Sequence, residues 1–272
     1  MLVTKETHAQ HSRPAGSEGA KRVPAAATGN ARDYRADFYG RYQSAFKRQQ
    51  ERAGDDAWRD GKLVPLIRDW CRPLRRDDPC IDLGCGDGRL LHALRTLGFT
   101  RLAGVDASSE QIALARRVAP EAAVGDLFEA LADFPENHFG LVTLFDVIEH
   151  LRKDEILRCA SLIHRKLKPG GVWLCHLPNG DSPLVGAVQA GDFTHETLLN
   201  PRSAQNLCAV AGFTGFEARE HLGASRSLAG TARAVAWRCV RLTIQGWNLI
   251  ETGSPGSGIF TRCFAFKAGK AA

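Results

Sequence analysis

The sequence lacks any run of about 18 apolar residues, so no transmembrane helix is expected. Its first residues do not join a basic stretch to an apolar core, which argues against a secretory signal peptide. None of its eight cysteines forms a C-x-x-C pair, which argues against a structural zinc site. The cysteines instead stand in apolar contexts, which predicts reduced, buried thiols in a cytoplasmic protein.

The sequence also contains no internal repeat, no separate RNA-binding module and no strip that combines aromatic and basic residues. A nucleic-acid partner is therefore not favoured. The net charge of +6 is compatible with anionic substrates, nucleic acid or a membrane surface and does not choose among them. The 272 residues are enough for one large α/β domain with additions.

Residues 1–30 are rich in small and polar residues without periodicity, and we expect a disordered tail there. Residues 31–272 are expected to form the folded domain. Aromatic residues then recur at helical spacing: Tyr34, Phe38, Tyr39, Tyr42 and Phe46. With a second helix over 58–74, they predict a helical lid over 34–74. The first helix either packs on the domain or covers a cofactor and donates a tyrosine hydroxyl, for which Tyr39 is the candidate.

Short apolar strands then alternate with helices, a pattern typical of crossover connections. Strands are expected over 81–83, 102–105, 122–124, 141–145, 172–177, 213–220 and 259–267. Helices are expected over 89–97, 109–118, 154–167 and 201–211. The pattern predicts an α/β fold with a doubly wound, mostly parallel sheet of seven strands.

An insertion over 222–258 separates the last two expected strands. Its helix, 227–250, carries Trp237 and Trp247 and has no acidic residue before Glu251. Its apolar residues form two rows, 237/240/244/247 and 228/235/242/249, which favours a helix packed inside the protein. The alternative is peripheral contact of 226–250 with the inner face of an anionic membrane.

The most informative stretch is residues 80–91, CIDLGCGDGRLL. A short apolar strand containing Asp82 meets a turn with glycine at 84, 86 and 88, and a helix follows. Arg89 stands where the dinucleotide fingerprint has its last glycine. The turn therefore predicts a ligand with an amino-acid end and a ribose rather than a pyrophosphate.

Acidic residues follow the next expected strands. Asp106 lies 22 residues after Gly84 and is placed to accept hydrogen bonds from a ribose diol. Asp126 can accept from the amine of an adenine, with Leu127 against the ring. The fourth strand ends in Phe145 and Asp146. Because parallel strands end at one edge, these side chains are expected to line one crevice.

Five motifs together resemble those of class I S-adenosylmethionine-dependent methyltransferases. They are DLGCGDG at 82–88, GVDAS at 104–108, GDL at 125–127, FDVIEHL at 145–151 and LKPGG at 167–171. The resemblance implies S-adenosylmethionine as cofactor and S-adenosylhomocysteine as product. It implies a cofactor site of Asp82, Gly84, Cys85, Gly86, Asp106, Ala107, Asp126, Leu127 and Phe145, with Tyr39 from the lid.

The segments 177–179, 192–196 and 211–213 resemble a bacterial subset that occurs with polysaccharide and glycolipid biosynthesis proteins. The resemblance implies a sugar hydroxyl, on a glycan, glycolipid or related small molecule, as acceptor. A hydroxyl needs a base during transfer, and His195 is the candidate, with His150 and Asp146 as further catalytic candidates. The alternative for His195 is a histidine that orders its loop.

A divalent metal held by Asp146, Glu149, His150 and His195 is a second hypothesis. A similar set, with Glu in place of Asp146, resembles that of small-RNA 2′-O-methyltransferases and quinone-pathway O-methyltransferases. Otherwise Glu149 and His150 orient cofactor and loop. Three alternative functions remain open: O-methylation of a phenolic, quinone-type or natural-product molecule, metal-assisted RNA 2′-O-methylation, and a non-catalytic cofactor-binding subunit.

Overall fold

The computed structural model describes residues 34–39, 56–221 and 227–272, within a compact unit that runs from Tyr34 to Ala272. The predictions for residues 1–30, and for Tyr42 and Phe46 in the lid, lie outside the described residues. None of the helices in the described ranges is long and apolar enough to cross a membrane.

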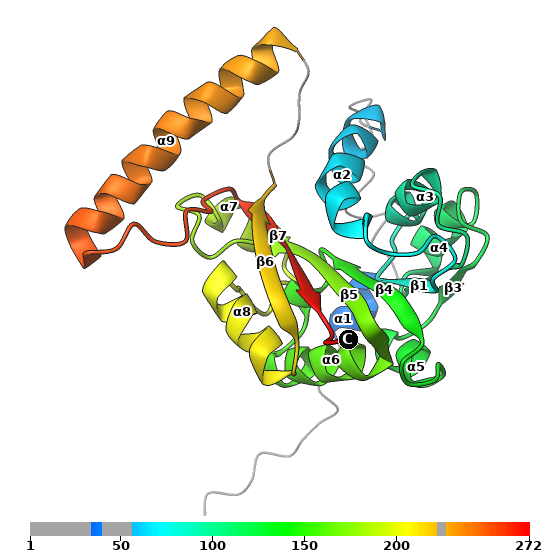
Figure 1. Ribbon diagram of the computed structural model, residues 1–272. Helices are drawn as coiled ribbons and strands as arrows, with labels where there is room; N and C mark the ends of the chain where they lie inside the picture. Colours follow the sequence, from blue (N-terminus) through cyan, green and yellow to red (C-terminus); the bar gives the residue numbers. More distant parts are fainter. Residues whose placement is uncertain (1–33, 40–55, 222–226) are drawn as a thin grey trace, which may run out of the picture. The chain divides into compact units, whose positions relative to one another are not determined.

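Seven strands form one sheet in the order β3-β2-β1-β4-β5-β7-β6 (Figure 1). The strands are β1 (Cys80–Leu83), β2 (Leu102–Asp106), β3 (Ala122–Val124), β4 (Phe139–Phe145), β5 (Leu167–Pro178), β6 (Thr214–Glu220) and β7 (Cys263–Gly269). The first five strands run parallel, and β7 pairs antiparallel with both β5 and β6. The predicted mostly parallel, seven-stranded sheet is therefore confirmed.

Helices cover both faces of this sheet. They are α1 (Tyr34–Tyr39), α2 (Asp56–Cys71), α3 (Arg89–Thr96), α4 (Ser109–Ala115), α5 (Leu127–Ala132), α6 (Lys153–Lys166), α7 (Gly186–Gln189), α8 (Pro201–Val210) and α9 (Leu228–Thr252), with a 3-10 turn η4 (Ile148–His150). One core cluster joins the sheet to α5, α6 and α8, and a second joins its other face to α2 and α3.

Side chains of each strand alternate between the two core clusters. In β1, Ile81 and Leu83 face the α6 side, whereas Cys80 faces the α2 side. In β5, Trp173 is fully buried on the α6 side and Leu174 on the other. This double burial is why the strands read as continuous apolar runs in the sequence.

The start of the last strand differs from the prediction. The last strand begins at Cys263, not at residue 259. The amide of Asn179 donates hydrogen bonds to the carbonyls of Ile259 and Thr261, both at 2.9 Å. The side chain of Asn179 thus takes the place of a neighbouring strand, and residues 259–262 form a loop.

The helices α5 and α7 were not predicted, because six and four residues are too few to show a helical period. The strand β5 also begins at Leu167, where it pairs with Phe139, five residues earlier than predicted. A register shift between Phe139 and Leu141 lets the LKPGG segment join the strand.

The insertion is a helix, as predicted, but its packing differs from the prediction. Of the first apolar row, Trp237 and Ile244 are partly buried, whereas Trp247 is 70% exposed. In the second row, all four side chains are exposed. The prediction of a helix packed inside the protein is therefore wrong for the second row, 228/235/242/249, which is called the outer row below.

Candidate functional site

The glycine turn at the end of β1 requires glycine for two different reasons. Gly84 has a φ of 72°, and a Cβ there would lie 2.2 Å from Cγ2 of Val147. Gly86 has a φ of 54°, but a Cβ there would meet nothing within 4 Å. Gly84 thus lets the turn pack against the β4 loop, whereas Gly86 leaves bare backbone beside open space, a cradle that a ligand can approach.

Asp106 at the end of β2 holds this turn in place. Its Oδ2 accepts a hydrogen bond from the backbone N–H of Gly86 at 2.9 Å, and its Oδ1 accepts one from Ser108 at 2.8 Å. Asp106 thereby joins the end of β2 to the glycine turn. Ala107 is exposed beside it, and Cys85 is buried in the turn.

Asp82 lies inside the sheet rather than at its edge. It is 2% exposed, and its Oδ1 accepts a hydrogen bond from the hydroxyl of Thr143 at 2.7 Å. Burial, with a smaller contribution from the charge of Asp106, raises the pKa of Asp82 to about 7. Asp82 therefore joins β1 to β4 directly beneath the glycine turn.

Asp126 lies at the N-terminus of α5. Its Oδ1 accepts hydrogen bonds from the backbone N–H groups of Phe128 and Glu129, at 2.8 and 3.1 Å. The residue is exposed, and Leu127 beside it is half-buried. Both predicted adenine contacts therefore stand at the sheet edge near Asp106, because β3 pairs with β2.

Asp146 begins a chain of hydrogen bonds with two histidines. Asp146, which has the left-handed φ of 55°, lies 2.6 Å from Nδ1 of His176 in β5. Nε2 of His176 lies 2.6 Å from Nδ1 of His221, just after β6. The ring of His176 also contacts Phe145, with centroids 5.6 Å apart. An anionic Asp146 fixes the tautomers of both rings. Nδ1–H of His176 donates to Asp146, and Nδ1–H of His221 donates to Nε2 of His176.

Three of the four predicted metal ligands form a separate cluster. Ligand atoms of Glu149, His150 and His195 all lie within 4.8 Å of one another, and Asp146 is not a member of this group. Glu149 and His150 are buried in η4, and the side chain of His195 is 8% exposed. Within the described part of the chain, Oε2 of Glu149 and Nδ1 of His195 are buried without a hydrogen-bond partner.

The loop that carries His195 is fixed to η4 by its backbone. The N–H groups of Glu196 and Thr197 both donate to the carbonyl of Glu149, at 2.8 and 3.0 Å. Nδ1 of His150 lies 2.8 Å from the hydroxyl of Thr194. His195 and Glu149 are thereby held together although 46 residues separate them.

The helix α1 packs on the same loop. Phe38 stacks on Phe193 with centroids 5.4 Å apart, and the hydroxyl of Tyr34 donates to Glu196. The ring of Tyr39 meets that of His150 edge-on at 6.1 Å. The first helix of the predicted lid therefore lies beside the Glu149 cluster, whereas α2, its second helix, packs with α3 on the other face of the sheet.

Burial shifts the ionisation of this cluster. It raises the pKa of Glu149 well above its ordinary value and lowers the pKa of His150. Burial therefore favours the uncharged carboxyl of Glu149 and the neutral imidazole of His150. A divalent cation would reverse this preference for Glu149, and the two unpartnered buried atoms fit such an ion.

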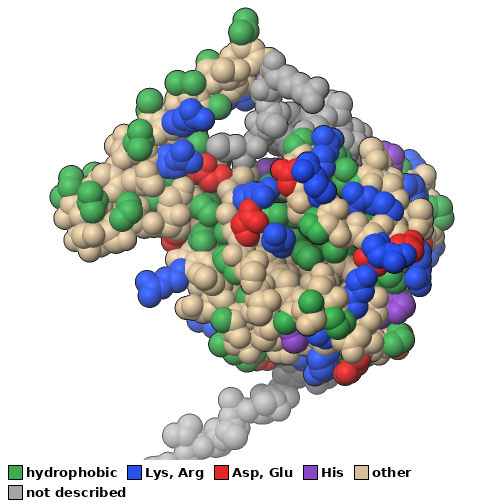
Figure 2. Space-filling model, viewed as in Figure 1, with side chains coloured by type: hydrophobic (Ala, Val, Ile, Leu, Met, Phe, Trp, Pro, Cys, Tyr) green, Lys and Arg blue, Asp and Glu red, His purple; other side chains and the backbone are tan. Residues whose placement is uncertain are grey.

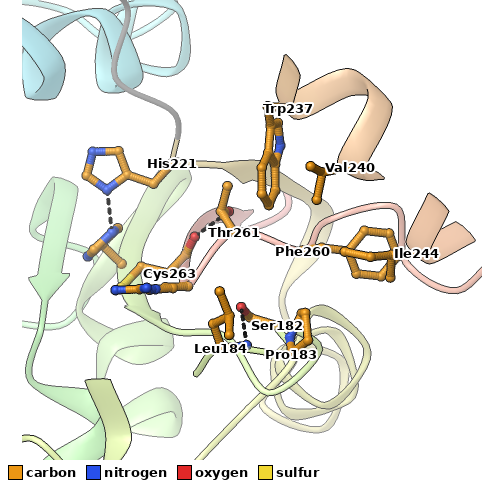
Figure 3. A pocket seen from close by; sticks show the side chains of 12 residues that line it. Ser182, Pro183, Leu184, His221, Trp237, Val240, Ile244, Phe260, Thr261 and Cys263 are labelled. Atoms are coloured by element: carbon orange, nitrogen blue, oxygen red, sulfur yellow. Dashed lines mark hydrogen bonds between the residues drawn. The ribbon is translucent and has the colours of Figure 1, made fainter. Parts of the chain in front are cut away.

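A pocket of about 570 Å³ lies beside the histidine chain (Figure 3). Its lining combines His176 and His221 with apolar side chains from α9 and from the loops before α7 and β7. The residues are His176, Ser182, Pro183, Leu184, His221, Trp237, Val240, Ile244, Phe260, Thr261, Arg262 and Cys263. His195, the predicted base, is not among them.

His176 and His221 were missed at the sequence level. His176 occupies one position of an apolar strand, and His221 follows a strand 45 residues later. No local spacing connects them, and only the antiparallel pairing of β5, β7 and β6 brings them together.

Residues 56–221 match the family described as "Methyltransferase domain". An uncharacterized methyltransferase of Synechocystis sp. is 34% identical over 158 residues, which cover 54% of this chain and 71% of that protein. A ubiquinone biosynthesis O-methyltransferase of Methylobacterium nodulans is 29% identical over 178 residues, which cover 56% of this chain and 70% of that protein.

Solved structures show the same fold. A SAM dependent methyltransferase from Archaeoglobus fulgidus aligns with a TM-score of 0.60 and 19% identity, over 79% of this chain and 97% of that one. A phosphoethanolamine N-methyltransferase of Haemonchus contortus, bound to phosphomonomethylethanolamine and S-adenosylhomocysteine, aligns with a TM-score of 0.54 and 21% identity, over 77% of this chain and 53% of that one.

Proposed function

The chain belongs to the methyltransferase-domain family, and on that premise we propose that it transfers a methyl group from S-adenosylmethionine to a hydroxyl group on an acceptor with an apolar body. The cofactor supplies a methyl group on a positively charged sulfur and leaves as S-adenosylhomocysteine. Two of the similar solved structures hold S-adenosylhomocysteine or S-adenosylmethionine, which supports this choice of cofactor.

The open cradle at Gly86 suits the amino-acid end of this cofactor. Asp106 would accept from the ribose, and Asp126 with Leu127 would flank the adenine. Phe145 would stand at the sulfur end, in contact with His176. Asp82, which is buried under the turn, would act by joining β1 to Thr143 of β4 rather than by touching the ligand.

The single observation that carries the acceptor class is the apolar pocket beside the histidine chain. A sugar presents hydroxyl groups on all sides and needs many polar partners, whereas this lining is mostly aliphatic and aromatic. It supports the phenolic, quinone-type or natural-product alternative over a sugar hydroxyl, and it does not favour a nucleotide. The similarity to a ubiquinone biosynthesis O-methyltransferase agrees with this choice.

The histidine chain provides the base for this reaction. When Asp146 is ionised, His176 donates to it and His221 donates to His176, each through Nδ1–H. Nε2 of His221 then has no proton and accepts the hydroxyl proton of the methyl acceptor. The acceptor oxygen gains the methyl group while the carbon–sulfur bond breaks, and the positive charge moves from sulfur to the imidazole. His176 and Asp146 position His221 and stabilise that charge.

We assign His195 and His150, with Glu149, to a divalent-cation site rather than to the base. Two imidazole nitrogens and a carboxylate suit Zn²⁺ or Mn²⁺. When bound, such a cation would lower the pKa of a hydroxyl group that reached it. Without a cation, the same residues would orient the loop at 192–196.

The test is methyl transfer to a panel that contains a prenylated catechol, a simple phenol and a monosaccharide. We expect turnover of the apolar catechol, and a drop in kcat of about 100-fold in His176→Asn with S-adenosylhomocysteine affinity unchanged. Val210→Gln, on the exposed surface of α8, is the matched control. Turnover of the monosaccharide alone would refute the acceptor class, and no transfer to any acceptor tried, in extracts as well, would favour the non-catalytic alternative.

A further inference from the structure

The outward side of α9 is an exposed apolar surface. Among the described residues, 14 large apolar side chains are exposed, and seven of them lie on this one helix, with exposed fractions from 46% to 91%. They are Leu228, Val235, Val240, Leu242, Trp247, Leu249 and Ile250. Five of them lie on the outward side, whereas Trp247 lies on a flank and Val240 lines the pocket. Single exposed apolar residues are ordinary, but a contiguous patch of this size marks an interaction site.

The spacing of these residues shows how the patch runs along the helix. Leu228, Val235, Leu242 and Leu249 are seven residues apart, so they lie in one row along a helix about 37 Å long. The opposite row holds Gly230, Trp237 and Ile244 towards the rest of the domain. The helix is anchored there, because Trp237 and Arg241 both bind the carboxylate of Glu220.

The charges of α9 indicate what covers the outer row. Arg238 is exposed and lies three residues after Val235 and four before Leu242, beside the outer row, along which hydrophobic side chains gather (Figure 2). The one acidic residue of α9, Glu251, accepts from Trp247 at the far end. In a pair of such helices, Arg238 of each copy would approach the other helix without an acidic partner in between. An anionic surface, in contrast, complements Arg238 and accepts leucine, valine and tryptophan side chains.

We propose that α9 docks the chain on an anionic lipid bilayer, with the outer row inserted among the acyl chains. Arg238 then reaches the phosphate groups of the lipids, since long basic side chains extend from the flanks of an interfacial helix. The pocket is lined by the inner row of the same helix, on its other side. The proposal does not depend on the methyl acceptor, because vesicle binding is measured without turnover.

The experiment is co-sedimentation of the full chain with vesicles of phosphatidylcholine, with and without phosphatidylglycerol. We expect binding to the anionic vesicles and at least about tenfold weaker binding by Leu242→Gln/Leu249→Gln, which keeps the net charge. Val210→Gln removes an equally exposed apolar side chain from α8 and is expected to bind like the original chain. Arg238→Gln should weaken binding about fivefold, only on anionic vesicles. Arg233→Gln removes an equal charge from the inner side of the helix and is expected to weaken binding less.

Circular dichroism establishes that each variant keeps its helix content. Failure of the original chain to bind anionic vesicles would overturn the proposal, and so would equal binding by Leu242→Gln/Leu249→Gln. The alternative occupant of the outer row is a second copy of the chain, and sedimentation velocity tests for it. If the original chain forms a dimer and does not bind vesicles, and the double variant is a monomer, the outer row is a dimer interface.

Discussion

The buried carboxyl of Asp82 makes a quantitative prediction about stability. Its pKa in the folded chain is about 7, because burial disfavours the charged form, whereas the unfolded value is 3.8. Between these two values the unfolded chain has lost this proton and the folded chain has kept it. Stability that is fully present below about pH 4 is therefore lost as the pH rises to about 7.

The magnitude follows from the size of the shift. Each unit is worth 1.36 kcal/mol, so a shift of about three units gives on the order of 4 kcal/mol over the whole window. Between pH 5 and pH 8 the expected loss of unfolding free energy is about 2.7 kcal/mol, because this free energy stops falling near pH 7. In Asp82→Asn the side chain stays neutral and can still accept from Thr143, so this loss is expected to vanish.

Urea unfolding at pH 5, 6, 7 and 8, without cofactor, measures the effect. The quantity compared is the change in unfolding free energy between pH 5 and pH 8, so that other titrating groups cancel between the original chain and Asp82→Asn. Asp133→Asn alters an exposed carboxylate just after α5 and is expected to leave the pH slope unchanged. Equal slopes for the original chain and Asp82→Asn would show that Asp82 is ionised in the folded protein and would refute the reasoning.

Three further predictions concern the ligand sites. Calorimetry should detect S-adenosylhomocysteine binding that Asp106→Ala abolishes, since the turn loses its bond to Gly86; retained binding would exclude Asp106 as a contact. Gly84→Ala should lower the Tm more than Gly86→Ala, because Gly84→Ala adds a clash with Val147 to the strain of a positive φ that both variants share; Gly86→Ala should weaken this binding about tenfold or more, and equal Tm losses would contradict the open cradle. Mn²⁺ or Zn²⁺ should raise the Tm, more at pH 8 than at pH 6 because Glu149 must release its proton, and Glu149→Gln should lose the effect; a pH-independent rise in that variant would place the ion elsewhere.

The glycine turn and the acidic strand ends could be predicted because their chemistry is local. A strand, a turn with glycine at 84 and 86, and a carboxylate at the end of the next strand follow one another within about 20 residues. Burial on both faces of the sheet also leaves a local mark, as apolar runs at β1, β4 and β5. These signals determine the fold and the family.

The acceptor side was decided only by tertiary structure. His176 and His221 meet through strands that pair out of sequence order, and Asp146 turns towards them and away from Glu149 because of its left-handed backbone. The outer row of α9 has the composition of a buried face, and only the fold shows that nothing in the described chain covers it. The sequence by itself determined which cofactor class the sheet edge suits, since that edge is built from consecutive segments. The base, the pocket and the exposed helix depended on contacts between distant segments, which no local pattern records.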